Sequence, residues 1–196
     1  MKMRLILSSC DFGNPVSART ICDNLGKPIA DCRVLYFPNE RYTEEKIKNG
    51  VYTSRLERFG FSRANIHVAE YRNPEPYLNS DIDAVYISGG NTFATLKLIR
   101  DAGFDKAISE YVHKGAVYIG GSAGAHIACV DIFHVTRYDE NSVGLTDFKG
   151  LCLYPGILIC HYSPERRADF ERLSAHGRYP VRVLSDKDVI VVETDK

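Results

Sequence analysis

A serine flanked by glycines stands where an apolar run of the chain meets a run of small residues. In the segment GGSAG, Ser122 lies between Gly120 and Gly124 in a G-x-S-x-G pattern. A strand that turns abruptly into a helix forces its corner residue into strained backbone angles, and glycines two positions away remove the side chains that would collide. The hydroxyl is then exposed at a helix N-terminus, whose free N–H groups suit an oxyanion. The pattern favours a nucleophilic serine over the alternative, a glycine-rich turn with an N-capping serine.

A nucleophilic serine needs a base, and His161 is the strongest candidate among the six histidines. It ends the apolar run GILIC and opens the polar loop HYSPERR, so we expect it at the end of a strand. The alternative for this residue is a partly buried histidine without a catalytic role. His126 follows Ser122 by one helical turn, and we interpret it as a residue of the pocket wall.

The third member of such a site is an acidic residue that orients the imidazole. The polar segment TRYDENS, residues 136–142, lies between the serine and the histidine in the chain. It offers Asp139 and Glu140 as adjacent alternatives, and Asp147 is a weaker one. A charged loop is usually only solvated, so the residues themselves leave this position open.

Short apolar runs alternate with longer mixed runs along most of the chain. Continuous apolarity indicates strands buried on both faces, as in a parallel sheet covered by helices. The sequence therefore predicts a layered α/β fold with a mostly parallel central sheet. The C-terminal third favours strands joined by turns, the final pair forming a β-hairpin at a sheet edge. The predicted strands are 4–9, 33–38, 65–71, 83–90, 115–122, 156–162 and two within 179–195, and the predicted helices are 43–60, 91–103 and 104–115.

The predicted fold gives a location for chemistry. In open parallel sheets, ligands bind beyond the carboxyl ends of the strands. The segments SGGN, residues 88–91, and GGSAG, residues 120–124, both fall at such ends. We therefore expect them to share one rim of the sheet.

Composition narrows the function classes further. The 196 residues, 44% of them hydrophobic, are expected to form one domain over 1–196. Lys+Arg and Asp+Glu both number 25, which argues against a nucleic-acid partner. The six cysteines show no zinc-like spacing, and their pattern favours a reducing compartment over a disulfide framework. No run approaches the about 18 apolar residues of a membrane span, so the expectation is a cytoplasmic protein with no membrane partner.

Three segments carry a resemblance to a known family: YISGGNTFATLKLIR, GAVYIGGSAGAHIAC and KGLCLYPGILICHYSPERR. Together with their spacing, they resemble the dipeptidase E family of serine peptidases, whose relatives include aspartyl dipeptidase and cyanophycinase. The resemblance implies a fold related to the class I glutamine amidotransferase-like domain, which is flavodoxin-like. It also implies a nucleophile elbow and neither a metal nor a cofactor.

The resemblance assigns catalytic roles. It implies that Ser122 is the nucleophile, that His161 is the base and that an acidic residue completes the site. Asp139 lies nearest the acidic position of the family, and Glu140 stays an alternative.

The resemblance also assigns residues that bind substrate. The oxyanion donors would be the backbone N–H groups of Gly90 and Ala123. Arg166 and Arg167 are the candidates for engaging an acidic substrate side chain, because either could pair bidentately with a carboxylate, and helix-surface charges are the alternative. Asn91, in the same Gly-Gly-Asn segment, is a further candidate for substrate binding.

The residues and the resemblance together predict a serine peptidase that hydrolyses small peptides through an acyl-enzyme, and dipeptides with an N-terminal aspartate are the expected substrates. We expect a monomer or a homodimer. One alternative is a non-catalytic binding or regulatory protein of the same fold. Another is a flavin or nucleotide binder that uses SGGNT as a phosphate nest, but the loop after the first strand, SSCDFGNP, holds only one glycine.

Overall fold

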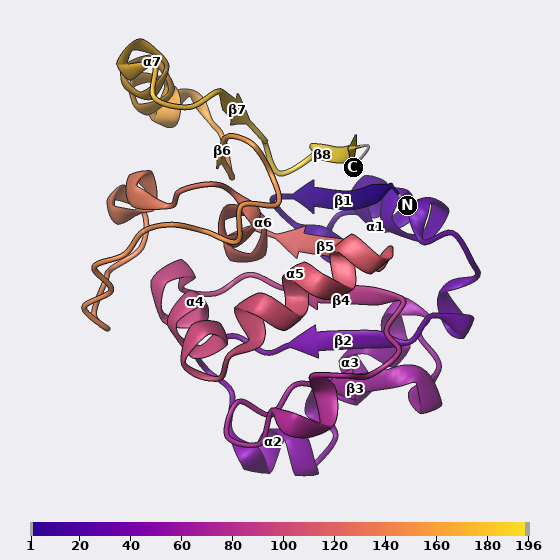
Figure 1. The fold of residues 1–196 in the computed structure, drawn as a ribbon. Helices are drawn as coiled ribbons and strands as arrows, with labels where there is room; N and C mark the ends of the chain where they lie inside the picture. The colour runs from indigo at the N-terminus through magenta and orange to yellow at the C-terminus, as the bar shows by residue number, and fades with distance from the viewer. Residues whose placement is uncertain (1, 195–196) are drawn as a thin grey trace.

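The computed structural model describes residues 2–194, and a six-stranded sheet lies at its centre (Figure 1). The strand order is β3-β2-β4-β5-β1-β8, and every neighbouring pair is parallel except β1 with β8, which is antiparallel. This is the mostly parallel central sheet that the sequence predicts. The strands are β1 (Met3–Ser8), β2 (Val34–Phe37), β3 (Ile66–Val68), β4 (Ala84–Ile87), β5 (Val117–Gly121) and β8 (Val189–Thr194).

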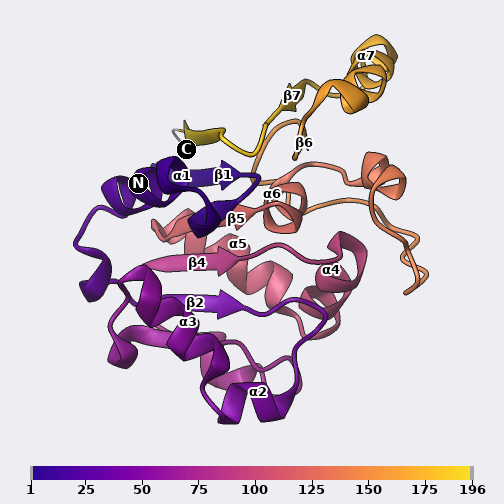
Figure 2. The same cartoon turned by 180° about the vertical axis from the view of Figure 1, so that it is seen from behind.

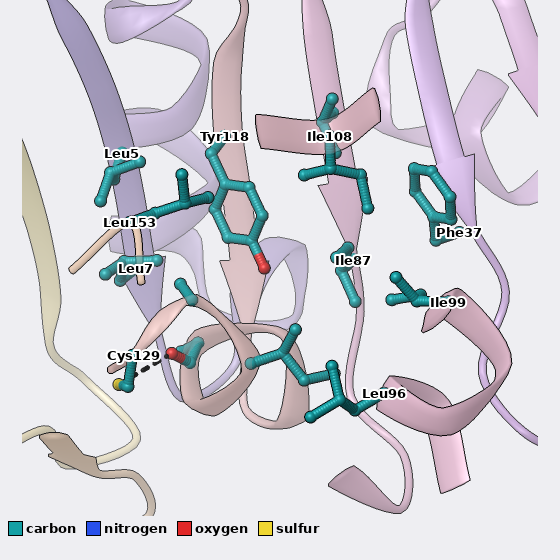
Figure 3. Packing of buried hydrophobic residues seen from close by; sticks show 14 of the residues in the cluster. Leu5, Leu7, Phe37, Ile87, Leu96, Ile99, Ile108, Tyr118, Cys129 and Leu153 are labelled. Carbon is teal, nitrogen blue, oxygen red and sulfur yellow. Dashed lines mark hydrogen bonds between the residues drawn. The ribbon is translucent and has the colours of Figure 1, made fainter. Parts of the chain in front are cut away.

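Both faces of this sheet are covered at its centre, which explains why the central strands β2, β4 and β5 are buried and apolar without interruption. In β4, Val85 and Ile87 pack into one hydrophobic cluster, whereas Ala84 and Tyr86 pack into a second cluster on the opposite face. Figure 3 shows part of the first cluster, in which the Tyr118 ring of β5 lies among aliphatic side chains from the sheet and the helices.

Helices form the outer layers of the molecule. Buried residues of α4 (Thr92–Asp101), α5 (Phe104–Lys114) and α6 (Ala123–Ala128) belong to the first cluster, and those of α1 (Pro15–Asn24) and α3 (Val51–Phe59) belong to the second. Figures 1 and 2 accordingly show α5 on one side of the sheet and α1 and α3 on the other. The α/β sandwich therefore buries two cores.

Two helical regions differ from the prediction. The predicted helix 43–60 is divided into α2 (Glu44–Lys48) and α3, because the chain turns at Gly50, whose φ is 67°. Helix α1 was not predicted at all. Its start carries a recognisable signal, since the Asn14 side chain accepts a hydrogen bond from the Val16 N–H at 2.8 Å and Pro15 occupies the first helical position.

The C-terminal strands divide between two sheets. β7 (Val181–Val183) pairs in parallel with β6 (Ile157–Ile159), and α7 (Arg167–His176) lies between them in the chain. The predicted antiparallel edge strand is present as β8, but it pairs with β1 and not with β7. The predicted C-terminal segment, residues 179–195, ends at Asp195, which lies outside the described residues. Because β7 and β8 belong to different sheets, residues 184–188 connect the small sheet to the edge of the large one (Figure 1).

Within residues 2–194, no helix combines the length and the apolarity that crossing a bilayer would require.

An ion pair fixes the N-terminal ends of β2 and β4. The Asp83 carboxylate accepts hydrogen bonds from the Arg33 N–H at 2.9 Å and from Arg33 Nε at 3.0 Å, and it contacts Lys27 Nζ at 2.9 Å. Burial raises the pKa of Asp83, but the hydrogen bonds from Arg33 and Lys27 outweigh it and leave the pKa well below the ordinary value of 3.8. The ionised carboxylate thus stabilises the folded state.

We expect Asp83→Asn to lower the free energy of unfolding by about 2 kcal/mol near neutral pH, because a charge-assisted network is lost. The difference from the wild type should shrink as the pH falls below 3.8, because the unfolded chain then takes up the proton before the folded chain does. Urea unfolding at several pH values measures both effects. Asp81→Asn is the control, since Asp81 also pairs with Arg33 but its side chain is 84% exposed. An equal loss in that variant would contradict the prediction.

Candidate functional site

Ser122 occupies the corner between β5 and α6. Its φ of 49° and ψ of −106° are rare for a residue with a side chain. The Ser122 N–H donates to the Ser8 carbonyl of β1 at 2.9 Å, and its own carbonyl accepts from the N–H groups of Ala125 and His126 at 2.9 and 3.0 Å. The strained corner is therefore held on both sides.

The glycines of the GGSAG segment are a steric requirement of this corner. A Cβ atom at Gly121 would overlap the Asp11 carboxylate, and one at Gly124 would overlap the Ile87 carbonyl oxygen. The Tyr118 hydroxyl, which Figure 3 shows pointing away from its strand toward α6, donates to the Gly124 carbonyl at 2.7 Å. The missing side chain of Gly124 thus lets α6 approach β4 this closely, and that of Gly121 leaves room for Asp11 beside β5.

His161 follows β6 and reaches Ser122 from a distant part of the chain. Its Nε2 lies 2.9 Å from Ser122 Oγ. The backbone of His161, at a φ of 52°, donates its N–H to Ser9 Oγ at 2.9 Å, and Ser9 Oγ in turn donates to the Leu184 carbonyl at 2.9 Å. The structure thus brings together the serine and the histidine that the sequence singled out.

Asp186, a residue that the sequence analysis did not consider, lies on the other ring nitrogen. Its Oδ1 is 2.5 Å from His161 Nδ1. This hydrogen bond lowers the pKa of Asp186, which favours the ionised carboxylate. An ionised acceptor assigns the proton to Nδ1 and leaves the Nε2 lone pair for the Ser122 hydroxyl. Ser122, His161 and Asp186 therefore form one hydrogen-bonded line.

Asp139 and Glu140 lie elsewhere, which corrects the prediction for the acidic residue. Asp139 Oδ2 accepts a hydrogen bond from the Thr92 N–H at 2.8 Å, at the N-terminus of α4. The Glu140 carbonyl accepts one from Asn91 Nδ2 at 2.8 Å, and the residue is exposed. The physical reason is the helix dipole of α4, whose positive end attracts the Asp139 carboxylate.

The two predicted oxyanion donors border the same rim as Ser122. A Cβ atom at Gly89 would lie 3.4 Å from Ser122 Cβ, so the turn after β4 contacts the serine. Asn39 Nδ2 donates to the Gly89 carbonyl at 2.8 Å, and the N–H of Gly90, in the same planar peptide, therefore points away from Asn39. Ala123 is the first residue of α6, and its N–H has no acceptor within the helix.

Asn91 is engaged by the protein itself. Its Oδ1 accepts from the Ala94 N–H at 2.9 Å as the cap of α4, and its Nδ2 donates to the Glu140 carbonyl. Both ends of the side-chain amide thus connect α4 with the loop of residues 139–140. This position is structural and differs from the predicted contact with substrate.

The two arginines differ sharply in position. Arg166 is half-buried, donates from Nη1 to the Cys160 carbonyl and lies with its guanidinium carbon 4.0 Å from the centre of the Tyr138 ring. Arg167 points to solvent, with 74% of its side chain exposed, and pairs with Glu171 at 2.8 Å. Arg166 alone of the two is fixed beside the strand end that carries the imidazole.

His126 is a neutral wall residue of the site. Burial holds its pKa well below the ordinary value of 6.5, and the neighbouring His134 adds to the effect. Its Nε2 accepts from the Cys160 N–H at 3.4 Å, and Nδ1 lies 3.5 Å from Thr92 Oγ1. It therefore packs between the strand end before His161 and the start of α4.

Cys10 is a second residue that sequence reasoning missed. Its Sγ, His161 Nδ1 and a carboxylate oxygen of Asp186 all lie within 4.8 Å of one another. Burial, followed by the charge of Asp186, raises the pKa of the Cys10 thiol to about 11. Within residues 2–194, these three side chains form the one group of three such ligands that lie this close together, so they could hold a metal ion.

Sequence comparisons identify relatives. The sequence model of peptidase family S51 matches residues 5–196. Peptidase E of Escherichia coli is 40% identical over 81 residues, which cover 41% of this chain and 34% of that protein. An uncharacterized peptidase of Listeria monocytogenes is 37% identical over 83 residues, which cover 41% of this chain and 40% of the relative. These matches thus span less than half the length of either relative.

Solved structures extend the likeness over the whole fold. A candidate peptidase E protein from Listeria monocytogenes superposes with a TM-score of 0.75 at 22% identity, covering 100% of this chain and 96% of its own. A peptidase from an acI-B1 actinobacterium superposes with a TM-score of 0.65 at 17% identity. The superposition covers 96% of this chain and 82% of that one. At these identities, the two structures establish the fold.

We expect Gly124→Ala to lower the free energy of unfolding by about 3 kcal/mol, because its methyl group would overlap the Ile87 carbonyl oxygen. Gly13→Ala is the matched control, since the nearest atom to its new methyl group would be 4.0 Å away. Chemical denaturation of both variants measures the difference. Similar stability of the two variants would show that the elbow is not closely packed.

Proposed function

The chain belongs to peptidase family S51, and from that premise we propose that it is a serine peptidase with Ser122, His161 and Asp186 as its catalytic triad. One observation carries the proposal: the hydrogen-bonded line from Ser122 Oγ to His161 Nε2 at 2.9 Å and from His161 Nδ1 to Asp186 at 2.5 Å. A serine hydroxyl is a weak nucleophile unless an adjacent base accepts its proton. The line supplies that base and the group that orients it.

In the proposed mechanism, Ser122 Oγ attacks the carbonyl carbon of a peptide bond while His161 Nε2 accepts the hydroxyl proton. The imidazolium then gives this proton to the leaving amine as the C–N bond breaks, which leaves an acyl ester on Ser122. Asp186 stabilises the imidazolium through Nδ1–H and stays ionised. A water molecule, activated by the same nitrogen, hydrolyses the ester and restores the serine.

The tetrahedral intermediate carries a negative charge that needs donors. We assign this role to the N–H groups of Gly90 and Ala123, the first beside the serine corner and the second at the start of α6. Donors fixed before the reaction stabilise the developing charge without reorganisation. The Asn39 hydrogen bond to the Gly89 carbonyl supports this role, because it sets the plane of the Gly90 peptide.

For the substrate, we propose small peptides with an N-terminal aspartate, recognised by Arg166. A guanidinium has five N–H donors, and the Cys160 carbonyl accepts from Nη1. Donors on a guanidinium that Tyr138 holds in place could pair bidentately with a carboxylate. Arg167, paired with Glu171 and exposed, has no such part in the proposal.

We expect Ser122→Ala and His161→Ala to lower kcat on small aspartyl dipeptides by about 10⁴-fold or more, because nucleophile and base act as a unit. Asp186→Asn should lower kcat by about 10³–10⁴-fold, because an amide favours the wrong tautomer of His161. Steady-state kinetics on purified variants, with circular dichroism as a check on folding, measures these effects.

Asp139→Asn is the matched control, because its amide oxygen can still accept from the Thr92 N–H. We expect its kcat to stay close to that of the wild type. A loss of kcat in Asp139→Asn as large as that in Asp186→Asn would contradict the assignment of Asp186 as the residue that orients His161. Equal hydrolysis by wild type and Ser122→Ala would refute the peptidase mechanism and favour a binding protein of the same fold.

We expect Arg166→Ala to raise KM for aspartyl dipeptides by about 10–100-fold, as for the loss of a charged hydrogen-bonded pair, and to change KM for leucyl dipeptides much less. Arg167→Ala should leave both values near those of the wild type. Comparing kcat and KM for the two substrate series tests this. An equal effect of Arg166→Ala on both series would remove the proposed preference for acidic substrates.

A further inference from the structure

Three potential metal ligands converge beside the serine. Cys10 comes from the segment after β1, His161 from the segment after β6, and Asp186 from the turn between β7 and β8. Their ligand atoms, Sγ, Nδ1 and a carboxylate oxygen, all lie within 4.8 Å of one another. Cys10 has no part in the proposed mechanism, so its place in this cluster needs a separate explanation.

The donor types indicate which ion would fit. A thiolate, an imidazole and a carboxylate are all ligands of tetrahedral Zn²⁺, and three protein ligands leave a fourth position open. At the usual Zn²⁺ distances, neighbouring ligand atoms are about 3.5 Å apart. The present separations bracket that value, from 2.5 Å between His161 and Asp186 to at most 4.8 Å across the group.

The site is accessible and can adjust. The Asp186 side chain is 66% exposed and that of His161 is 39% exposed. Opening the His161–Asp186 contact by about 1 Å would admit an ion at ordinary ligand distances, and Asp186 lies in the turn of residues 184–188. The positive charge of Arg166 works against any cation bound to Asp186, so an ion that also forms a bond to sulfur fits this site better than one held by charge alone.

We propose that Zn²⁺ binds to Cys10, His161 and Asp186 and reversibly inhibits the enzyme. The inhibitory effect rests on the proposed peptidase function, whereas the binding does not. On binding, the Cys10 thiol releases its proton to solvent. The Nδ1 proton of His161 is lost as nitrogen binds the ion, and Nε2 takes one up. One proton is released in total, and Nε2 can no longer accept the proton of Ser122.

The first experiment measures inhibition. We expect added ZnCl₂ to inhibit the wild type, EDTA to restore activity, and equal concentrations of MgCl₂ or CaCl₂ to have no effect. Cys10→Ser should raise the half-inhibitory Zn²⁺ concentration by at least about tenfold, since even outer-shell partners are worth that much. Each variant is compared with its own metal-free rate. Cys152→Ser is the matched control, because Cys152 is an exposed free cysteine that does not belong to the cluster.

The second experiment measures binding without activity. Co²⁺ added to Ser122→Ala should give a thiolate-to-cobalt absorption band that Zn²⁺ displaces and that the double variant Ser122→Ala/Cys10→Ser lacks. If this band appears but the wild type hydrolyses no peptide, the metal site stands and the peptidase proposal is wrong. Absence of a Cys10-dependent band, or equal Zn²⁺ inhibition of wild type and Cys10→Ser, would overturn the metal site.

Discussion

Hydrogen bonds at the carboxyl end of β1 hold the whole site together. The Ser8 carbonyl accepts from the N–H of Ser122, and the Ser9 hydroxyl accepts from the N–H of His161 while donating to the Leu184 carbonyl. One short segment thus positions the serine corner, the histidine and the start of the turn that carries Asp186. Ser9 is 2% exposed, so these bonds form where an unpaired polar group would be costly.

The strained backbone of the site depends on this support. Ser122 and His161 both have positive φ angles, of 49° and 52°, and neither is glycine. Such conformations cost about 1–3 kcal/mol each and persist only where surrounding contacts fix them. The close packing of Gly124 against β4 fixes the first, and Ser9 fixes the second. The same contacts that strain the chain therefore direct the two side chains toward each other.

The sequence predicted the parts of the fold that local patterns specify. Buried parallel strands are apolar without interruption, so the runs containing β1, β2, β4 and β5 were recognisable. The pairing of β8 with β1 has no such local signal. An edge strand can pair with a neighbour in sequence or with a distant strand, and tertiary packing determines which of the two it pairs with. The break at Gly50 was missed because the apolar spacing continues across it.

The same distinction explains which site residues could be predicted. Ser122 has a local signal, because the glycines around it meet a steric need, and His161 has one because it ends an apolar strand. Asp186 has no such local signal, because it lies in a polar turn. The turn reaches the imidazole of His161 because β7 and β8, which it connects, belong to different sheets. The segment between Ser122 and His161 offers Asp139 and Glu140, and the family resemblance favours Asp139, but the start of α4 binds Asp139 instead.

The exposed position of Asp186 links the two proposals for this site. A buried orienting carboxylate would be inaccessible to ions, whereas this one is 66% exposed and lies with Cys10 on the Nδ1 side of the ring. The proton on Nδ1 decides between the two states. While it stays there, Nε2 can serve Ser122, and when a metal ion replaces it, Nε2 becomes a donor. Catalysis and metal binding therefore exclude each other through one tautomer of His161.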